Sequence, residues 1–514
     1  MQKLIALAEK KQFISSLSWN TLTVVLQIVI QTVYTGLLAR MIAPESFALM
    51  GVVLSIMGFA EIFSQVGIGP AIIQRKELHP QHLSGAFYTS LILGVTFTLG
   101  FVLAAPFFAS TYHIPELEPI MQVVSTSFTI AALAVVPRSL MLKEMKFKSF
   151  FVAGMISIVG GNLIVGLWLA YLGFGVWAYV WALFAQNALM TLAYWALQPV
   201  RFPLYWKWKY TKDLIAYGAS STVFNALNYA ATKVDVTILP KYVTKLPSSG
   251  SIDRLGSAGI YERSAYVMSL PITIMAKLSD NVLFSGMSKM QDETARLQRL
   301  IAVATQMLAL AIIPLVVFSA AFSKEIITIY LGSKFSLAIP ILQILLFAVI
   351  FRTLSRLADS LVRAKDAVVK ASWYKAFYLL IMIAGVYISI PFGTKWIAAS
   401  ILLTTIIHYL MSIHLCHVLI GSTWSTQLKA TLPGFKLGVI TALVCAPFEL
   451  EWFIPDVAPL LRLAIGFIVW VAVILGIILR SPKILEANGI SPLELLPEKI
   501  KRRLGKWGNG KMGK

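Results

Sequence analysis

Charged residues are scarce in this chain. Asp, Glu, Lys and Arg together make up 13% of its 514 residues, whereas hydrophobic residues make up 58%. An average soluble domain has about 25% charged residues. This composition excludes a soluble globular domain and favours a chain that lies largely within a lipid bilayer.

Cysteine is nearly absent, and a secretion signal is not found. Cys416 and Cys445 both fall in apolar stretches, so the sequence predicts no disulfide framework. Residues 1–15 have neither a long apolar core nor a small-residue cleavage site, and we therefore expect no cleaved signal peptide. The first apolar run is expected to remain as a membrane span.

Motifs of enzymes and metal sites are also missing. The sequence has no Walker A motif, no Gly-x-Ser-x-Gly and no soluble insert large enough for a nucleotide-binding domain. The pairs His79 with His82 and His414 with His417 lack neighbouring clusters of cysteine or carboxylate, so they predict no metal site. We expect a protein that is not an enzyme and needs no cofactor.

Long apolar runs dominate what is present. A helix needs roughly 20 apolar residues to cross the hydrocarbon core, and about fourteen runs reach that length. They lie near residues 17–39, 46–69, 85–110, 117–137, 149–172, 175–198, 213–240, 257–288, 297–322, 337–362, 368–391, 396–420, 427–449 and 458–480. The predicted fold class is an all-α polytopic membrane protein with about 14 transmembrane helices.

The positions of Lys and Arg test this count of spans. With a cytoplasmic amino terminus, roughly 29 Lys and Arg fall in inside segments and about 7 in outside loops, as the positive-inside rule requires. The net charge of +21 therefore reflects topology rather than a nucleic-acid-binding face. We expect both termini to be cytoplasmic.

The spans group into two similar halves. Asn228 and Thr232 of the seventh span align with Gln27 and Gln31 of the first, as two parallel six-helix repeats would require. We predict a cytoplasmic amphipathic N-terminus (1–16), an N-lobe (17–205), a C-lobe (206–421), two extra spans (422–480) and a basic cytoplasmic tail (481–514). The tail is read as an amphipathic helix on anionic headgroups, or alternatively as a solvated disordered segment.

Polar side chains follow one face of several spans and suit a hydroxyl-rich cargo. The candidate cavity-lining residues are Asn20, Gln27, Gln31 and Tyr34 in the first span, Glu61 in the second, and Ser221, Asn225, Asn228 and Thr232 in the seventh.

Ionisable residues inside spans are expensive, at roughly 2.5 to 3.5 kcal/mol for each charge that faces lipid. Eight were identified: Glu61, Lys233, Asp235, Lys277, Asp280, Arg352, Arg356 and Asp359. Their summed cost would exceed a typical folding stability of about 5 to 15 kcal/mol. They are expected to pair, to lie off-centre or to face water.

The tenth span carries the most informative charges. Arg352, Arg356, Asp359 and Arg363 follow at i, i+4, i+7 and i+11 and share one helical face. Guanidinium groups bind phosphate oxygens in a bidentate fork, so this face suits an anionic substrate. The alternative is that Arg356 and Arg363 anchor the cytoplasmic end of the helix.

Other charges in the spans have open interpretations. Lys233 or Lys277 is a candidate to help the arginines hold an anionic substrate. Asp235 and Asp359 are candidates for a coupling ion, although an ion pair to a neighbouring helix explains Asp235 equally well. Lys277 is also placed to pair with Asp280 at i+3.

Short segments resemble a known family over about residues 15 to 420. They are Leu38, Ala39, Arg40, Phe47, Gly67, Ile68 and Ile72 to Glu77; Pro137, Arg138, Leu140, Lys143, Glu144 and Phe147; Gly259, Tyr261, Ala265 and Pro271; Lys289 to Asp292, Thr294 and Leu297; and Leu331, Gly332, Lys334, Ile339, Pro340, Leu342 and Gln343. The pattern resembles the polysaccharide transporter family, especially its colanic-acid-type Wzx exporters. Leu283 to Gly286 departs from the Phe-Pro that often ends the eighth span in such exporters.

The resemblance implies two six-helix bundles around a central cavity and membership of the multidrug, oligosaccharidyl-lipid and polysaccharide exporter superfamily. It implies a flippase in the bacterial inner membrane. Such a flippase moves an undecaprenyl-diphosphate-linked repeat unit from the cytoplasmic to the outer leaflet by alternating access, for cell-surface polysaccharide synthesis. The implied partners are this lipid-linked oligosaccharide, membrane lipids at the basic tail, and a polysaccharide polymerase or other assembly proteins.

Two other functions are alternatives. A cation-coupled multidrug antiporter shares the twelve-helix plan and would use Asp235 and Asp359, but an excess of cationic residues argues against cationic drugs as cargo. A membrane glycan polymerase or ligase usually needs a large external loop, whereas the longest outside loop here, residues 241–256, is short.

Overall fold

A computed structural model describes residues 2–64, 68–75, 78–201, 219–242, 254–449, 458–480 and 482–489. Within these ranges the chain is helical and contains no β-strand. The predicted all-α fold class is thereby confirmed. The chain divides into two compact units, Met1–Glu262 and Arg263–Lys514.

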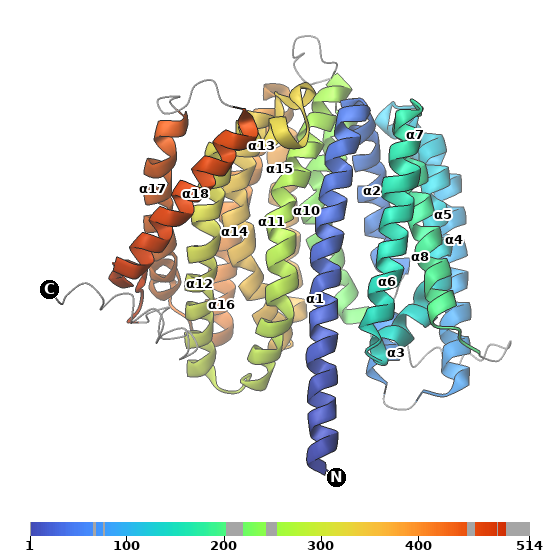
Figure 1. Cartoon of the computed structure of the whole chain (residues 1–514), viewed down its shortest axis with the longest axis horizontal. Coiled ribbons are helices and arrows are strands. Elements are labelled where there is room, and N and C mark those ends of the chain that lie inside the picture. The colour runs from blue at the N-terminus through green and yellow to red at the C-terminus, as the bar shows by residue number, and fades with distance from the viewer. Residues whose placement is uncertain are drawn as a thin grey trace. The chain divides into compact units, whose positions relative to one another are not determined.

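The first unit contains the helices drawn from blue to green in Figure 1. They are α1 (Gln2–Met41), α2 (Pro44–Ser64), α3 (Ile68–Gln74), α4 (Pro80–Tyr112), α5 (Leu117–Lys143), α6 (Phe147–Ser157), η1 (Ile158–Gly166), α7 (Leu167–Tyr171), α8 (Val176–Leu197) and α10 (Ala219–Lys241). Helix α11 (Arg254–Lys289) begins in this unit and continues into the second.

The second unit contains the remaining elements. They are α12 (Thr294–Ala321), α13 (Ser323–Tyr330), η3 (Ser333–Phe335), α14 (Ala338–Ala364), α15 (Val368–Ser389), η4 (Ile390–Phe392), α16 (Thr394–Ile420), α17 (Trp424–Glu449), α18 (Pro459–Arg480) and η5 (Pro482–Leu485). Helix α10, which opens the predicted C-lobe, packs against α2 within the first unit. The lobe boundaries drawn from the sequence stay a prediction.

In the described part of each of the fourteen predicted spans, the chain is helical. Twelve of these helices, searched over the described residues, are long and apolar enough to cross a membrane. The other two positions belong to α10 and α11, which carry more polar and charged residues. The prediction of about fourteen spans therefore agrees with the positions of the helices, and twelve of them also meet the apolar criterion.

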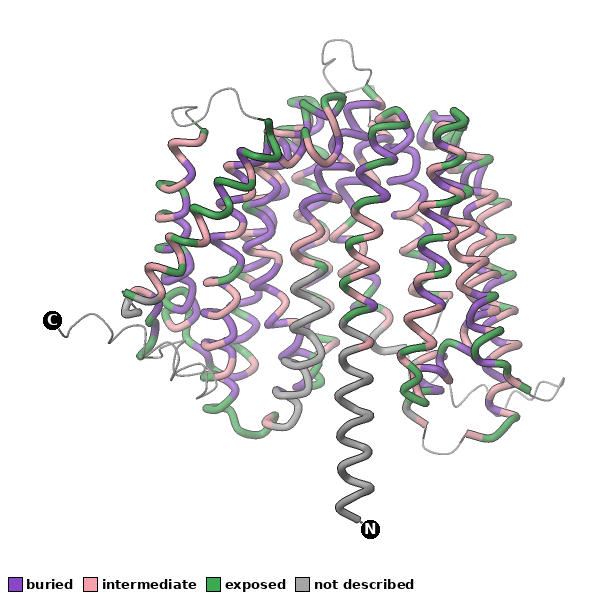
Figure 2. The backbone as a smooth tube through the Cα atoms, viewed as in Figure 1, coloured by how far each residue is buried: buried purple, intermediate pink, exposed green. Residues whose placement is uncertain are grey.

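Large apolar side chains cover outward faces of the helices, as lipid contact requires. On α4, Leu99, Leu103 and Phe107 are exposed, whereas Ala105 and Ala109 are buried. Figure 2 shows the same alternation of buried and exposed positions along other helices. Exposed apolar stripes on a chain of this composition identify the surface that meets lipid.

The predicted fifth span is not a uniform α-helix. It is formed by α6, the π-helix η1 and α7. A Cβ at Gly161 would collide with the backbone nitrogen of Gln186 on α8, so glycine permits the close approach of η1 and α8. A π-helical segment of this kind often accompanies a functional region.

The two extra helices belong structurally to the second unit. A Cβ at Gly434 of α17 would lie 2.5 Å from the carbonyl oxygen of Ala309 on α12, so these two helices are in close contact. Arg462 of α18 forms an ion pair with Glu325 of α13, with 3.3 Å between Nε and Oε1. Both side chains are buried, and the pair therefore fixes α18 against α13.

Candidate functional site

Helix α14 carries the cationic face predicted from the sequence. Arg352 and Arg356 are partly buried on it, whereas Arg363 is exposed at the end of the helix. The Nε and Nη2 atoms of Arg352 are buried and have no hydrogen-bond acceptor among the described residues. A buried guanidinium with unused donors is chemically suited to receive an anionic ligand.

Asp359, one helical turn beyond Arg356, is paired with a lysine from the next helix. Lys375 of α15 lies 3.1 Å from each carboxylate oxygen of Asp359. The Lys375 side chain is only 5% exposed and that of Asp359 18%. The ion pair links α15 to α14 and neutralises one of the three positive charges gathered there.

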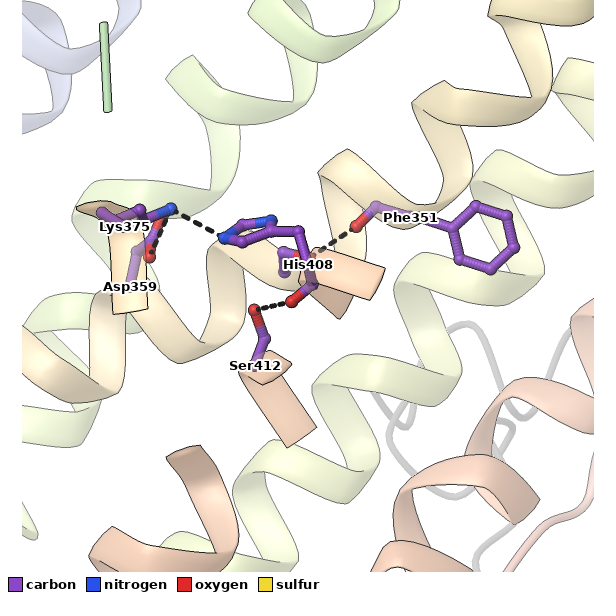
Figure 3. Close-up of polar contacts among 6 residues, drawn as sticks. Phe351, Asp359, Lys375, His408 and Ser412 are labelled. Carbon is purple, nitrogen blue, oxygen red and sulfur yellow. Dashed lines mark hydrogen bonds and ion pairs between the residues drawn. The ribbon is translucent and has the colours of Figure 1, made fainter. Parts of the chain in front are cut away.

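His408 of α16 completes this group, which Figure 3 shows in close-up. Its Nε2 lies 3.2 Å from Nζ of Lys375. The ring of Tyr378 stacks on His408 with 4.1 Å between centroids, and Ser412 donates a hydrogen bond to the His408 carbonyl oxygen. An ammonium has donors only, so this contact assigns the acceptor role to Nε2 and the proton of a neutral imidazole to Nδ1.

These side chains form one electrostatic group, the α14–α16 cluster, defined as Arg352, Arg356, Asp359, Lys375 and His408. The charges of Lys375 and Arg352 both act on His408. Helix α16 packs against both α14 and α15, which brings the contributing faces together. With neutral His408, three positive charges stand against one carboxylate, and the cluster keeps a net charge of +2.

Asp235 of α10 lies in a different environment, within the first unit. It is buried, and its Oδ2 accepts a hydrogen bond of 2.9 Å from the Tyr261 hydroxyl. Its Oδ1 is buried without a hydrogen-bond partner among the described residues. Lys233 is exposed, as expected for two residues that point to different sides of one helix.

The polar face of α1 packs against α6 and η1. Gln31 accepts a 2.7 Å hydrogen bond from Asn162 of η1, and Gln27 lies against Gly154 of α6. Tyr34 is buried, with its ring edge-on to the ring of Tyr179 at 6.4 Å. The role of Gln27, Gln31 and Tyr34 as cavity-lining residues stays a prediction.

The remaining predicted site residues are spread over α1, α2, α10 and α11. Glu61 and Asn225 are exposed, and Asn228 and Thr232 are half-buried. Thr232 hydrogen-bonds to the carbonyl oxygen of Tyr229 on its own helix. The side chains of Asn20, Ser221, Lys277 and Asp280 lie outside the described residues.

Lys375 and His408 were absent from the set derived from the sequence. Each lies within a predicted span, and an ionisable residue in a span is a candidate functional residue by that fact alone. The sequence predicted that Asp359 would pair, lie off-centre or face water, but it did not indicate which helix carries the partner. Among the described residues, no group of three His, Cys, Asp or Glu side chains is placed to hold a metal ion.

Comparison with known proteins identifies relatives of this chain. The chain is 23% identical over 447 residues to the lipopolysaccharide biosynthesis protein WzxC of Escherichia coli. This match covers 85% of this chain and 87% of WzxC. It is 22% identical over 446 residues to the teichuronic acid biosynthesis protein TuaB of Bacillus subtilis (83% and 87%), and 22% identical over 331 residues to the succinoglycan biosynthesis transport protein ExoT of Rhizobium meliloti (64% and 65%).

Solved structures share the fold at low identity. The lipid II flippase MurJ in an inward closed conformation matches with a TM-score of 0.67 at 14% identity, over 89% of this chain and 98% of that chain. An inward-facing multidrug resistance transporter of the MATE family matches with a TM-score of 0.64 at 16% identity, over 77% and 96%.

The decisive match is to a family model. Residues 37–340, more than half of the chain, match the model described as "Polysaccharide biosynthesis protein". That range contains Arg40, the segment Ile72 to Glu77 and the Ile339-Pro340 step from which the resemblance was drawn. The chain therefore belongs to the polysaccharide biosynthesis protein family.

Proposed function

We propose that this protein is a flippase that moves a lipid-diphosphate-linked oligosaccharide across the bacterial inner membrane for cell-surface polysaccharide synthesis. Relatives over most of the chain are named for the biosynthesis of lipopolysaccharide and teichuronic acid. A flippase for a lipid-linked precursor has the same fold. Alternating access is the transport mode that this fold supports.

The α14–α16 cluster is the observation that carries the proposal. A diphosphate has to be held within the membrane by groups that stay charged at every physiological pH, and guanidinium groups meet this condition. Arg352 has buried donors to offer, and Arg356 lies one turn away on the same face. Both arginines bind the diphosphate in this proposal. Lys233 and Lys277 remain candidate helpers.

The sugar part of the substrate requires hydrogen-bonding groups rather than charge. The polar residues of α1 and α10, among them Gln27 and Asn228, are proposed to contact sugar hydroxyl groups, because amides both donate and accept. Asp235, buried with one hydrogen-bond partner, is proposed to bind a coupling ion. Both termini are proposed to be cytoplasmic, with a polysaccharide polymerase and other assembly proteins as partners.

Arg352→Ala tests the proposal in proteoliposomes loaded with a fluorescent lipid-diphosphate oligosaccharide. Hydrogen bonds to charged groups contribute about 1.5 to 3 kcal/mol, so flipping at limiting substrate is expected to fall by roughly 10- to 150-fold. Arg352→Lys keeps the charge without the bidentate fork and should recover part of the rate. The assay measures substrate accessible to an external quencher over time.

Arg363→Ala is the matched control, because Arg363 lies on the same helix but is exposed at its end. This variant is expected to flip substrate at the wild-type rate. The proposal fails if wild-type vesicles flip no faster than empty ones. Full flipping by Arg352→Ala would remove the arginine from the substrate site.

A multidrug antiporter is the second candidate, favoured by the MATE fold and by the buried carboxylate of Asp235. The net charge of +2 in the α14–α16 cluster would repel cationic drugs. A deletion strain distinguishes the two functions. Unchanged drug susceptibility together with a defect in surface polysaccharide would favour the flippase over the antiporter.

A further inference from the structure

Asp359 and a bound diphosphate would compete for the same cations. Lys375 forms an ion pair with Asp359 and a hydrogen bond with His408. We propose that Asp359 takes up a proton when a diphosphate binds to Arg352 and Arg356, and that this proton releases Lys375 to become a third cation for the ligand. This inference rests on the proposed function.

The geometry places the competing groups side by side. Asp359 is three residues beyond Arg356 and seven beyond Arg352, so all three share one face of α14. Lys375 lies 3.2 Å from Nε2 of His408, and the charge of Arg352 also acts on this buried ring. A phosphate that engages Arg352 therefore lies within the electrostatic range of Lys375 and of Asp359.

The balance of charges predicts that Asp359 takes up a proton when the diphosphate binds. A carboxylate beside an incoming anion is destabilised, and protonation removes its negative charge. The proton comes from solvent and binds a carboxylate oxygen of Asp359, and the Asp359–Lys375 ion pair opens. The net charge of the cluster rises from +2 to +3, while the ligand supplies the compensating negative charge.

His408 acts here as a positioning residue. Its Nε2 accepts from the Lys375 ammonium, so it can keep this cation in the cluster after Asp359 has released it. Tyr378 holds the imidazole ring by stacking, at an angle of 24°. A neutral His408 therefore favours the charged form of Lys375.

The other titratable groups around Asp359 do not replace it in this role. Asp359 is the one carboxyl group on the packed helices α14, α15 and α16, whose other titratable side chains are Lys, Arg, His, Tyr and Cys. The described charges of α12, Arg296 and Arg299, lie near its first turn, and Glu325 of α13 is paired with Arg462. Side chains of α11 from 274 to 286 lie outside the described residues.

Thermodynamic linkage turns this arrangement into a measurable quantity. If the diphosphate promotes protonation of Asp359, then protons promote binding of the diphosphate by the same factor. Binding to the wild-type protein should therefore take up a fraction of a proton per ligand and become tighter as the pH falls. Without Asp359 this dependence should disappear.

Calorimetric titration of the purified full-length protein with farnesyl diphosphate tests the inference. Titrations at one pH, well above the pKa of about 6 of the ligand's own terminal phosphate, in two buffers of different ionisation enthalpy give the number of protons taken up by the protein. Proton uptake is expected for the wild type and none for Asp359→Asn, whose affinity should equal or exceed that of the wild type. Lys375→Gln should weaken binding by about tenfold, as one lost charge-assisted contact predicts.

Glu325→Gln is the matched control, because it removes a carboxylate from another buried ion pair of the same unit, at 3.3 Å. Its proton uptake should equal that of the wild type. An infrared difference spectrum of the wild type needs no variant and should show a protonated carboxyl band on ligand addition. This measurement keeps the inference testable if Asp359→Asn does not fold.

The outcomes separate the inference from the proposed function. Binding that depends on Arg352 but takes up no proton overturns the inference and leaves the flippase proposal standing. Uptake that persists in Asp359→Asn and disappears in His408→Gln also overturns it, because the proton then belongs to the imidazole. Farnesyl diphosphate that does not bind, or binds equally to Arg352→Ala, rejects the diphosphate site itself.

Discussion

Buried charge is the property by which individual residues affect the stability and function of this protein most strongly. Lys375 and Asp359 both lie within helices with their side chains largely buried, and each neutralises the other. Removing one member of a buried ion pair leaves an uncompensated charge, whereas replacing both by apolar residues is often neutral. Stability and function should therefore respond differently to single and double substitutions.

Lys375→Met is expected to destabilise the protein by about 3 to 5 kcal/mol, because Asp359 then stays buried beside no lysine. The double variant Lys375→Met with Asp359→Leu should recover most of that loss yet bind diphosphate more weakly. Thermal unfolding in detergent, followed by intrinsic fluorescence, measures the first effect. A double variant no more stable than the single one would contradict this account.

At the residue scale, the sequence is sufficient where the spacing within one helix carries the information. The spacing of Arg352 and Arg356 predicts one face of a single helix, and α14 contains both residues, whereas their role at a substrate site stays a prediction. Lys375 and His408 become prominent only when three helices are packed together, since each is an isolated polar residue in its own span. A contact between helices is a tertiary property that periodicity does not contain.

At the scale of elements, apolar length predicted where helices lie but not their internal irregularities. The spans near 117–137 and 396–420 correspond to α5 and α16 with small shifts of their ends. The short helices α3 and α13 were missed because seven or eight residues carry no span signal. The π-helix was missed because its residues are as apolar as those of an α-helix.

Gly161→Ala should disrupt the contact between η1 and α8, because its Cβ would collide with the backbone at Gln186. Overpacking of this kind costs about 1 to 3 kcal/mol. Gly100→Ala in α4 is the matched control, since nothing lies within 4 Å of its added Cβ. It should be neutral or stabilising by up to about 1 kcal/mol. Chemical denaturation in micelles compares the two, and equal stability would exclude tight packing at Gly161.

At the scale of the whole molecule, the family and fold agree with the sequence reading, and the two extra helices gain a structural role. Beyond the α17 and α18 contacts, Gln306 of α12 donates a hydrogen bond to the Leu485 carbonyl oxygen, and Asn488 donates to that of Thr426. The segment after α18 therefore returns to the helices that precede it. The sequence predicted two extra spans but could not show what they pack against.

Truncation tests that dependence. A chain that stops at residue 421 loses α17 and α18 and exposes the α12 surface around Ala309, so it should fail to accumulate in the membrane. A chain that stops at residue 489 keeps every described element and should accumulate normally. Fluorescence of a carboxyl-terminal reporter fusion measures both, and equal levels would show that α17 and α18 are dispensable for folding.

The π-helix η1 also changes which residues of α6 and α7 lie on the same face. A π turn contains more residues than an α turn, and one additional residue corresponds to roughly 100° of rotation about the helix axis. Faces assigned to α6 by counting in steps of three and four therefore do not continue into α7. Cysteine-accessibility profiles along residues 147–171 should show a periodic signal that slips in phase across Ile158–Gly166. Any assignment of lipid-facing and interior positions in this segment must restart after Gly166.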